Sequence, residues 1–156
     1  MPETNLRVTL LSCTPEPEKA CAFAARLCYA SADFDELREK VNTQDQSAFL
    51  RGVVGMGHLS VLEHASFTFE IEGVSRSLLA QLTRHRIASF SVRSQRYVSL
   101  ANGFDYIIPP RIKDLGEDAM REFGAQMEQM HEWYVTLQER LGSGESANED
   151  ARFVLP

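Results

Sequence analysis

The chain has 156 residues and a mass of 17.6 kDa, with 44% hydrophobic and 24% charged residues. These values are ordinary for globular proteins and argue against disorder, collagen and coiled coil. A chain of this length can bury a core, so we expect a single domain over residues 1–156. Its apolar stretches are shorter than the roughly 18–20 residues of a membrane span, which predicts a soluble protein without a membrane partner.

The charges are distributed unevenly around a net charge of −6. Residues 73–104 contain five arginines, one histidine and no acidic residue, while all twenty-two acids lie elsewhere. Nucleic-acid-binding proteins usually carry a basic excess, so nucleic acid is not the expected partner. One basic segment on an acidic protein instead favours a small anionic ligand.

The three cysteines, Cys13, Cys21 and Cys28, form no CxxC pair, and the first residues lack the features of a signal peptide. The spacing of Cys21 and Cys28 puts both on one helix face, which favours interior packing over a disulfide. These features predict a cytoplasmic protein.

The first half of the chain predicts a strand at 7–11 and a helix over 20–29, whose start is signalled by Thr14 as the capping residue and by Pro17. A second helix is expected from about residue 45 to the glycines at 55 and 57. Apolar and polar residues alternate over 66–72, as in a half-buried strand. Ser75 can then cap a helix through Arg84, with Leu78 among its inward residues.

The second half predicts extended structure over 88–100 and a long helix over about 117–141, with apolar residues at three- and four-residue spacing. The sequence Ser146-Ala147-Asn148-Glu149 fits a capping box that begins another helix. The order of elements favours an α/β fold of the α+β type, with a mixed or antiparallel sheet packed with helices.

Two patterns near the middle of the chain carry little chemistry. Residues 55–60, GMGHLS, approach GxGxxG but follow a helix instead of a strand, which favours a helix end and a turn. His58, Glu63 and His64 match neither HExxH nor HxxEH, so no metal site is expected.

The basic segment is more informative. Arginines at a helix C-terminus are common, but four arginines in residues 84–96, interleaved with serines and without an acid, favour phosphate binding. On a helical wheel Gln81, Arg84 and His85 share one stripe. Because the Gln81 amide can both donate to and accept from a base edge, this combination suits a nucleotide.

Residues 84–97, RHRIASFSVRSQRY, resemble the RHRxxSxNxxSxRY signature of the flavin-dependent thymidylate synthases. The resemblance extends through residues 57–64, GHLSVLEH, and residues 149–156, EDARFVLP. It implies a homotetrameric enzyme of the thymidylate synthase-complementing fold, with sites between subunits. Such an enzyme makes dTMP from dUMP, with methylenetetrahydrofolate as carbon donor and NADPH as reductant through FAD.

The resemblance also implies site residues. FAD contacts are expected at His58, Ser60, Arg84, His85, Arg86 and Val92. Contacts to dUMP are expected at Gln81, Leu82, Thr83, Arg84, Val92, Arg93, Ser94, Gln95, Arg96 and Arg152. Of these, Arg96 and Arg152 are expected to meet the phosphate. No catalytic residue is assigned: Ser94 matches a disputed nucleophile of the family and lies in no nucleophile motif, so we expect it to bind ligand.

The sequence departs from the family pattern in three ways. Ser91 stands where many members have Asn, and Val92 where some have a ligand-contacting Glu. The family also continues for several tens of residues beyond Leu155-Pro156, including an arginine thought to activate the uracil. We therefore expect a chain that lacks the C-terminal part of the enzyme.

Two alternatives remain at this point. The same arginines, with Phe90 and Tyr97 as stacking residues, could form a non-catalytic nucleotide- or RNA-binding module. The second alternative is an inactive fragment that still binds flavin.

Overall fold

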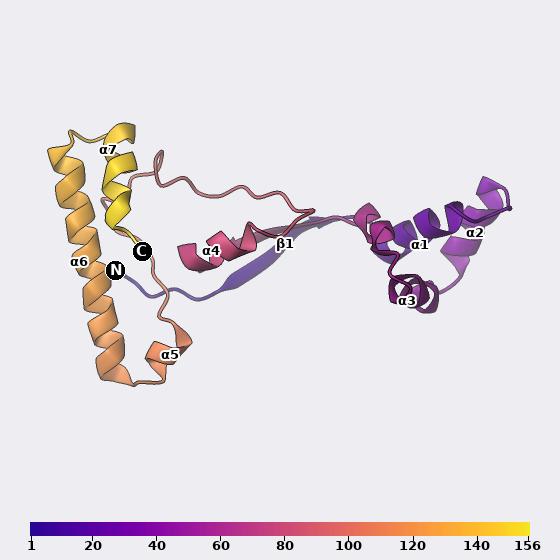
Figure 1. Ribbon diagram of the computed structural model, residues 1–156, viewed down its shortest axis with the longest axis horizontal. Helices are drawn as coiled ribbons and strands as arrows, with labels where there is room; N and C mark the ends of the chain where they lie inside the picture. Colours follow the sequence, from indigo (N-terminus) through magenta and orange to yellow (C-terminus); the bar gives the residue numbers. More distant parts are fainter. The chain divides into compact units, whose positions relative to one another are not determined.

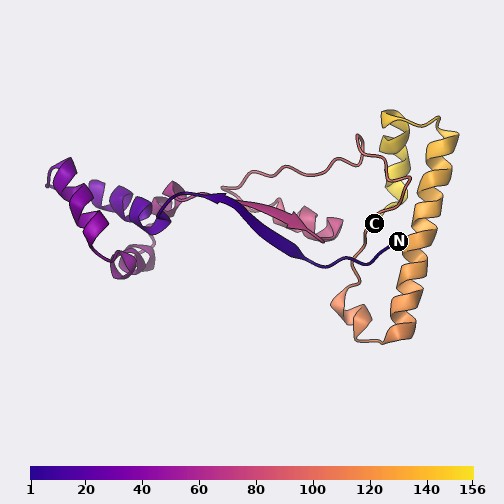
Figure 2. The ribbon, with the colours of Figure 1, turned by 180° about the vertical axis from the view of Figure 1, so that it is seen from behind.

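The computed structural model describes residues 1–156 (Figures 1 and 2). It divides into two compact units, Val8–Glu70 and the combination of Met1–Arg7 with Ile71–Pro156. Helices predominate beside one small antiparallel two-stranded sheet, which confirms the predicted α+β type of fold. The assignment of all 156 residues to a single domain stays a prediction.

The unit of residues 8–70 carries most of both strands and a group of short helices. In chain order its elements are β1 (Arg7–Cys13), α1 (Pro17–Leu27), α2 (Phe34–Thr43), α3 (Ser47–Gly55), the 3-10 helix η1 (Leu59–His64) and β2 (Phe67–Glu72). Helix α1 contacts α2, α3 and η1 (Figure 1). Its small buried residues Cys21 and Ala22 pack with Leu50 of α3 to form the core of this unit.

Several predictions for this unit need correction. Thr14 does not cap α1: its hydroxyl accepts a hydrogen bond from the Ser66 backbone N–H over 2.9 Å, and Glu16 precedes the helix in the left-handed region at φ 45°. Cys21 is buried as predicted, but Cys28 is exposed because α1 ends at Leu27. Helix α2 was not predicted from the sequence, although Asp33 caps it by accepting from the Asp35 N–H.

The second unit is built around one long helix. Its elements are α4 (Arg76–Leu82), α5 (Pro110–Lys113), α6 (Glu117–Arg140), α7 (Glu145–Ala151) and the 3-10 helix η2 (Arg152–Val154). Helix α6 matches the predicted helix and contacts α5, α7 and η2, and Figures 1 and 2 both show α7 alongside it. Met127 and Tyr134 of its apolar stripe are buried.

The local predictions were less accurate at three places in this unit. The capping box is wrong, because Gly144, at φ 87°, precedes α7 and no side chain caps that helix. Ser75 does cap α4, accepting from the Leu78 N–H over 3.1 Å, but α4 ends at Leu82 and Leu78 is 46% exposed. Residues 88–100 pair with no other strand and include a turn at 95–97.

None of the helices is both long and apolar enough to cross a membrane. Large apolar side chains nevertheless remain exposed along both strands and on α4. They are Val8, Leu10, Leu11, Phe67, Phe69, Ile71 and Leu78, each at least 40% exposed. In a single chain about half of the surface of each of these residues is left in water.

Candidate functional site

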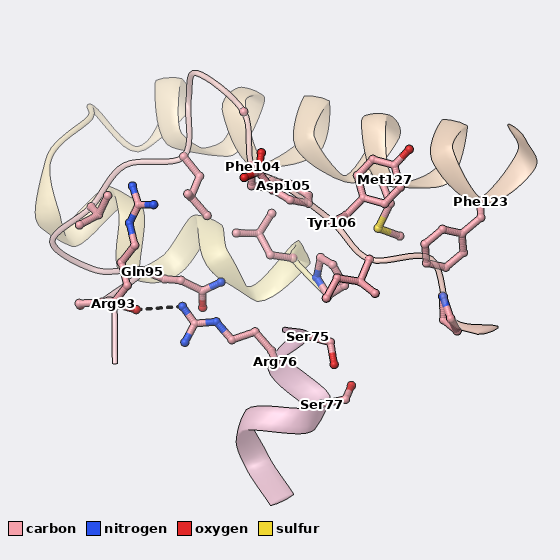
Figure 3. A pocket seen from close by; sticks show the side chains of 18 residues that line it. Ser75, Arg76, Ser77, Arg93, Gln95, Phe104, Asp105, Tyr106, Phe123 and Met127 are labelled. Carbon is pink, nitrogen blue, oxygen red and sulfur yellow. Dashed lines mark hydrogen bonds between the residues drawn. The ribbon is translucent and has the colours of Figure 1, made fainter. Parts of the chain in front are cut away.

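A pocket of about 540 Å³ lies within the second unit (Figure 3). Part of its wall is polar and comes from the start of α4 and from the arginine-rich segment that follows this helix. These polar residues are Ser75, Arg76, Ser77, Arg93, Ser94 and Gln95. An apolar part of the wall is formed by Phe104, Tyr106, Phe123 and Met127, the last two on α6. Asp105 adds one carboxylate to the lining. Two arginines beside aromatic surface suit an anion that carries a flat ring.

Arg76 holds the polar wall together. Its guanidinium Nη2 donates to the backbone carbonyl of Arg93 over 3.0 Å, which ties the start of α4 to the arginine-rich segment (Figure 3). Burial lowers the pKa of Arg76, and the positive charge of Arg152 lowers it further. No carboxylate pairs with Arg76 or Arg93, so both guanidinium groups can interact with an anion.

Ser94 has a structural role within this wall. Its hydroxyl oxygen accepts hydrogen bonds from the backbone N–H groups of Arg96 (3.2 Å) and Tyr97 (3.3 Å). These contacts form a serine-stabilised turn, in which the side chain replaces a backbone acceptor. No side-chain base is hydrogen-bonded to the Ser94 hydroxyl, so the geometry shows no activated nucleophile.

Arg96 and Arg152, the two expected phosphate contacts, both approach Glu149. Arg96 Nη1 lies 3.9 Å from Glu149 Oε2, and Arg152 Nη2 lies 3.5 Å from Glu149 Oε1. Arg96 is further paired with Glu145 through Nε, over 2.9 Å. Its pKa is raised by the hydrogen bond to Tyr97 and by the two carboxylates. The structure thus brings together two cations that are 56 residues apart in the sequence.

The segment that follows α4 carries the other predicted residues. Thr83 uses its hydroxyl to donate to the Leu79 carbonyl over 3.0 Å, and Arg84, His85 and Arg86 are exposed and form no ion pair. The predicted helical stripe through Gln81 is not formed, because the helix ends at Leu82 before Arg84 and His85 are reached. These side chains remain available at the surface.

Of the predicted site residues, only Arg93, Ser94 and Gln95 line this pocket, and the last three of the others are Val92, His58 and Ser60. Val92 is exposed in the irregular segment. His58 and Ser60 belong to the unit of residues 8–70, where His58 precedes η1 and both are exposed. The preceding turn contains Gly57 at φ 86°, as expected for a turn after a helix end, instead of a dinucleotide-binding loop. The roles of these three residues stay predictions.

No function was predicted from the sequence for Arg76. The same is true of Asn148 and Gln138, two buried polar residues next to the segment that carries Arg96. Arg76 had a visible signal, because it is the first arginine of the segment that contains no acid. Asn148 and Gln138 had no such signal: both lie among helix-forming residues, and only the packing of α6 against α7 buries them.

A family model for thymidylate synthase complementing proteins matches residues 9–156. The chain belongs to this family. It is 49% identical over 152 residues to the flavin-dependent thymidylate synthase of Geobacter sulfurreducens, covering 97% of this chain and 63% of that protein. The enzymes of the same name from Nitratidesulfovibrio vulgaris and Clostridium tetani are 44% and 43% identical, with 100% and 97% of this chain covered. The chain spans 66% and 65% of their lengths.

A solved structure of another protein confirms the fold of this chain. The UMP/dUMP methylase PolB from Streptomyces cacaoi, bound with 5-Br dUMP, matches with a TM-score of 0.76. The match covers 99% of this chain and 69% of that chain, at 24% sequence identity. The likeness extends over the whole described chain and therefore includes the arginine-rich segment.

Proposed function

We propose that the protein is a flavin-dependent thymidylate synthase, which transfers a one-carbon unit from methylenetetrahydrofolate to dUMP. The observation that carries this proposal is the convergence of Arg96 and Arg152 on Glu149, over 3.9 and 3.5 Å. Two guanidinium groups that approach one carboxylate can also grip a phosphate, for which their planar donor sets are suited. Family membership supports the same conclusion.

The dUMP contacts follow from this arrangement. The phosphate is held by Arg96 and Arg152, while Arg76 and Arg93 add positive charge to the adjoining pocket. Gln95 lines that pocket and offers an amide to the uracil edge. Gln81, Leu82, Thr83, Arg84, Val92 and Ser94 complete the proposed substrate contacts.

FAD is the proposed cofactor, and the donors present suit it. Arg84, His85 and Arg86 are exposed and unpaired, so their ring and guanidinium N–H groups can meet the two phosphates of the flavin dinucleotide. Because these side chains follow the C-terminus of α4, they must supply the positive charge without help from the helix dipole. When bound, FAD would carry reducing equivalents from NADPH. His58, Ser60 and Val92 are further proposed flavin contacts.

We also propose that the active form is a homotetramer in which sites lie between subunits. The exposed apolar residues of β1, β2 and α4 support this assembly, because a monomer leaves them in water. Neighbouring copies of the chain would cover these faces and bring additional residues to each site. A cytoplasmic location is proposed for this assembly.

An anaerobic assay of dTMP formation tests the proposal. The protein in its full natural length is incubated with dUMP, methylenetetrahydrofolate, NADPH and FAD, and control reactions omit one component each. We expect dTMP only in the complete mixture. A folded protein that acquires a flavin spectrum but makes no dTMP is the inactive flavin-binding alternative. Tight RNA binding without flavin uptake would instead identify a binding module, and either result overturns the proposal.

A further inference from the structure

A buried cluster of three polar side chains lies directly behind Arg96. It consists of Tyr134 and Gln138 of α6 and Asn148 of α7, which are 0%, 7% and 4% exposed. We propose that Asn148 is a positioning residue, which holds the loop of Arg96 in place so that its guanidinium meets the substrate phosphate. This inference rests on the proposed function and deepens it.

The contact between Asn148 and the loop is direct. Asn148 Nδ2 donates to the backbone carbonyl of Arg96 over 2.9 Å. Asn148 belongs to α7, and the same short helix and the turn after it carry Glu145, Glu149 and Arg152. A single hydrogen bond therefore fixes the backbone at Arg96 relative to the helix that directly precedes Arg152.

The rest of the cluster orients the Asn148 amide. Its Oδ1 accepts from the Tyr134 hydroxyl over 3.2 Å and from Gln138 Nε2. With the oxygen occupied by these donors, the nitrogen must face Arg96. Tyr134 also accepts from the Leu100 N–H over 3.2 Å, and Gln138 donates to Ser99 Oγ over 2.8 Å. The cluster thus contacts the loop at Arg96, Ser99 and Leu100.

The loop needs such a fixed partner because it has no regular structure of its own. Residues 88–100 form no strand. The end of the segment is held by the Ser94 turn, by the Arg76 bond to the Arg93 carbonyl, by His131 Nε2 at 3.0 Å from the Leu100 carbonyl and by the bonds of this cluster. No fully buried side-chain polar atom lacks a hydrogen-bond partner, so none is left unpaired inside the cluster. A satisfied buried network specifies one arrangement, whereas a partly satisfied one is destabilising.

The test compares binding of dUMP with binding of deoxyuridine, which lacks the phosphate. Dissociation constants of both ligands are measured by calorimetry on the flavin-loaded wild type and on Asn148→Ala. If Asn148 positions Arg96, the preference for dUMP falls about tenfold, equivalent to about 1.4 kcal/mol. Binding of deoxyuridine should change little, because the lost interaction involves only the phosphate.

A matched control separates positioning from general loss of stability. Gln46 is also a buried amide, 2% exposed, with three hydrogen-bonding partners: Arg26 Nε donates to it, and it donates to the carbonyls of Val41 and Gln44. It belongs to the unit of residues 8–70. Gln46→Ala should lower the thermal midpoint but keep the wild-type preference for dUMP over deoxyuridine.

The variant Tyr134→Phe replaces Asn148→Ala in this binding comparison if Asn148→Ala does not fold. It keeps the ring but removes one donor to Asn148, and we expect the dUMP preference to fall about threefold, as for a weakened hydrogen bond. If the folded Asn148→Ala variant keeps the wild-type preference for dUMP over deoxyuridine, the positioning role is overturned. The same holds for Tyr134→Phe where that variant is used. A wild type that does not prefer dUMP over deoxyuridine contradicts the proposed function itself.

Discussion

Arg96 and Arg152 lie on opposite oxygens of one carboxylate, that of Glu149, at 3.9 and 3.5 Å. Glu149 screens two cations that would otherwise repel each other, and it also adds negative charge where we place the phosphate. The first effect favours phosphate binding, because it keeps the two arginines together. The second effect opposes it, because the carboxylate repels the phosphate. A substitution that keeps the shape of Glu149 and removes its charge can decide which of them dominates.

We expect Glu149→Gln to bind dUMP more tightly, by about two- to fivefold at low salt, because charge interactions near a surface contribute up to about 1 kcal/mol. The gain should shrink as salt is added. The control Asp150→Asn removes the neighbouring charge of α7, which forms no ion pair, and should leave affinity nearly unchanged. Weaker binding by Glu149→Gln would show that the carboxylate mainly orients the arginines.

Arg152 and Arg86 should separate by ligand, whereas Arg84 is assigned to both ligands. Arg152→Ala is expected to raise the dUMP concentration needed for half-maximal activity by at least about tenfold, as for loss of a charge-assisted hydrogen bond, with little change for FAD. Arg84→Ala and Arg86→Ala should weaken FAD binding without unfolding, because both residues are exposed and unpaired. Titrations of each ligand measure both effects. An equal loss for both ligands in Arg152→Ala would contradict the assignment.

Local sequence patterns are sufficient to predict some elements of this fold and not others. The long helix α6 was predicted within one residue, because its apolar stripe and its length leave no other choice. Ser75 was correctly predicted to cap α4, since the cap is a local interaction. The start of α7 was predicted incorrectly, because Gly144 and not Ser146 occupies the capping position.

The site was predictable to the extent that it is encoded in the arginine-rich segment. Charge patterning indicated an anion, and the family resemblance named Arg96 and Arg152. The Arg152–Glu149 contact is a local i, i+3 pair, but the approach of Arg96 to Glu149 depends on how the arginine-rich segment lies against α7, which no local pattern contains. For the same reason Asn148 could not be recognised as a partner of the loop.

Tyr134 provides a test of the buried cluster by stability. Its ring is completely buried and its hydroxyl bonds to Leu100 and Asn148. In Tyr134→Phe the Leu100 N–H loses its partner, so we expect about 1–3 kcal/mol of destabilisation in urea unfolding. Tyr29→Phe is the control, because Tyr29 is 86% exposed, and it should stay within about 0.5 kcal/mol of the wild type. Equal stabilities of the two variants would contradict the hydrogen-bonding role of Tyr134.

Asp45 gives a prediction for the dependence of stability on pH. It accepts from the Ser47 backbone N–H over 3.0 Å and from the Ser47 hydroxyl over 2.7 Å, at the start of α3. These bonds lower the pKa of Asp45 below its ordinary value of 3.8 in the folded chain. The folded state therefore binds a proton at Asp45 less readily than the unfolded state does. The resulting stabilisation is present above the ordinary value and is lost as the pH falls through the lowered one.

Asp45→Asn keeps the size of the side chain but cannot titrate. We expect the wild type to be the more stable protein at neutral pH, with the difference shrinking as the pH falls below 3.8. Thermal unfolding of both proteins across this range measures the effect. Asp35→Asn is the matched control, because Asp35 lies in the first turn of α2, where its backbone N–H donates to Asp33 and no bond to its own carboxylate is formed. A constant difference between wild type and Asp45→Asn at all pH values would mean that the charge of Asp45 does not stabilise α3.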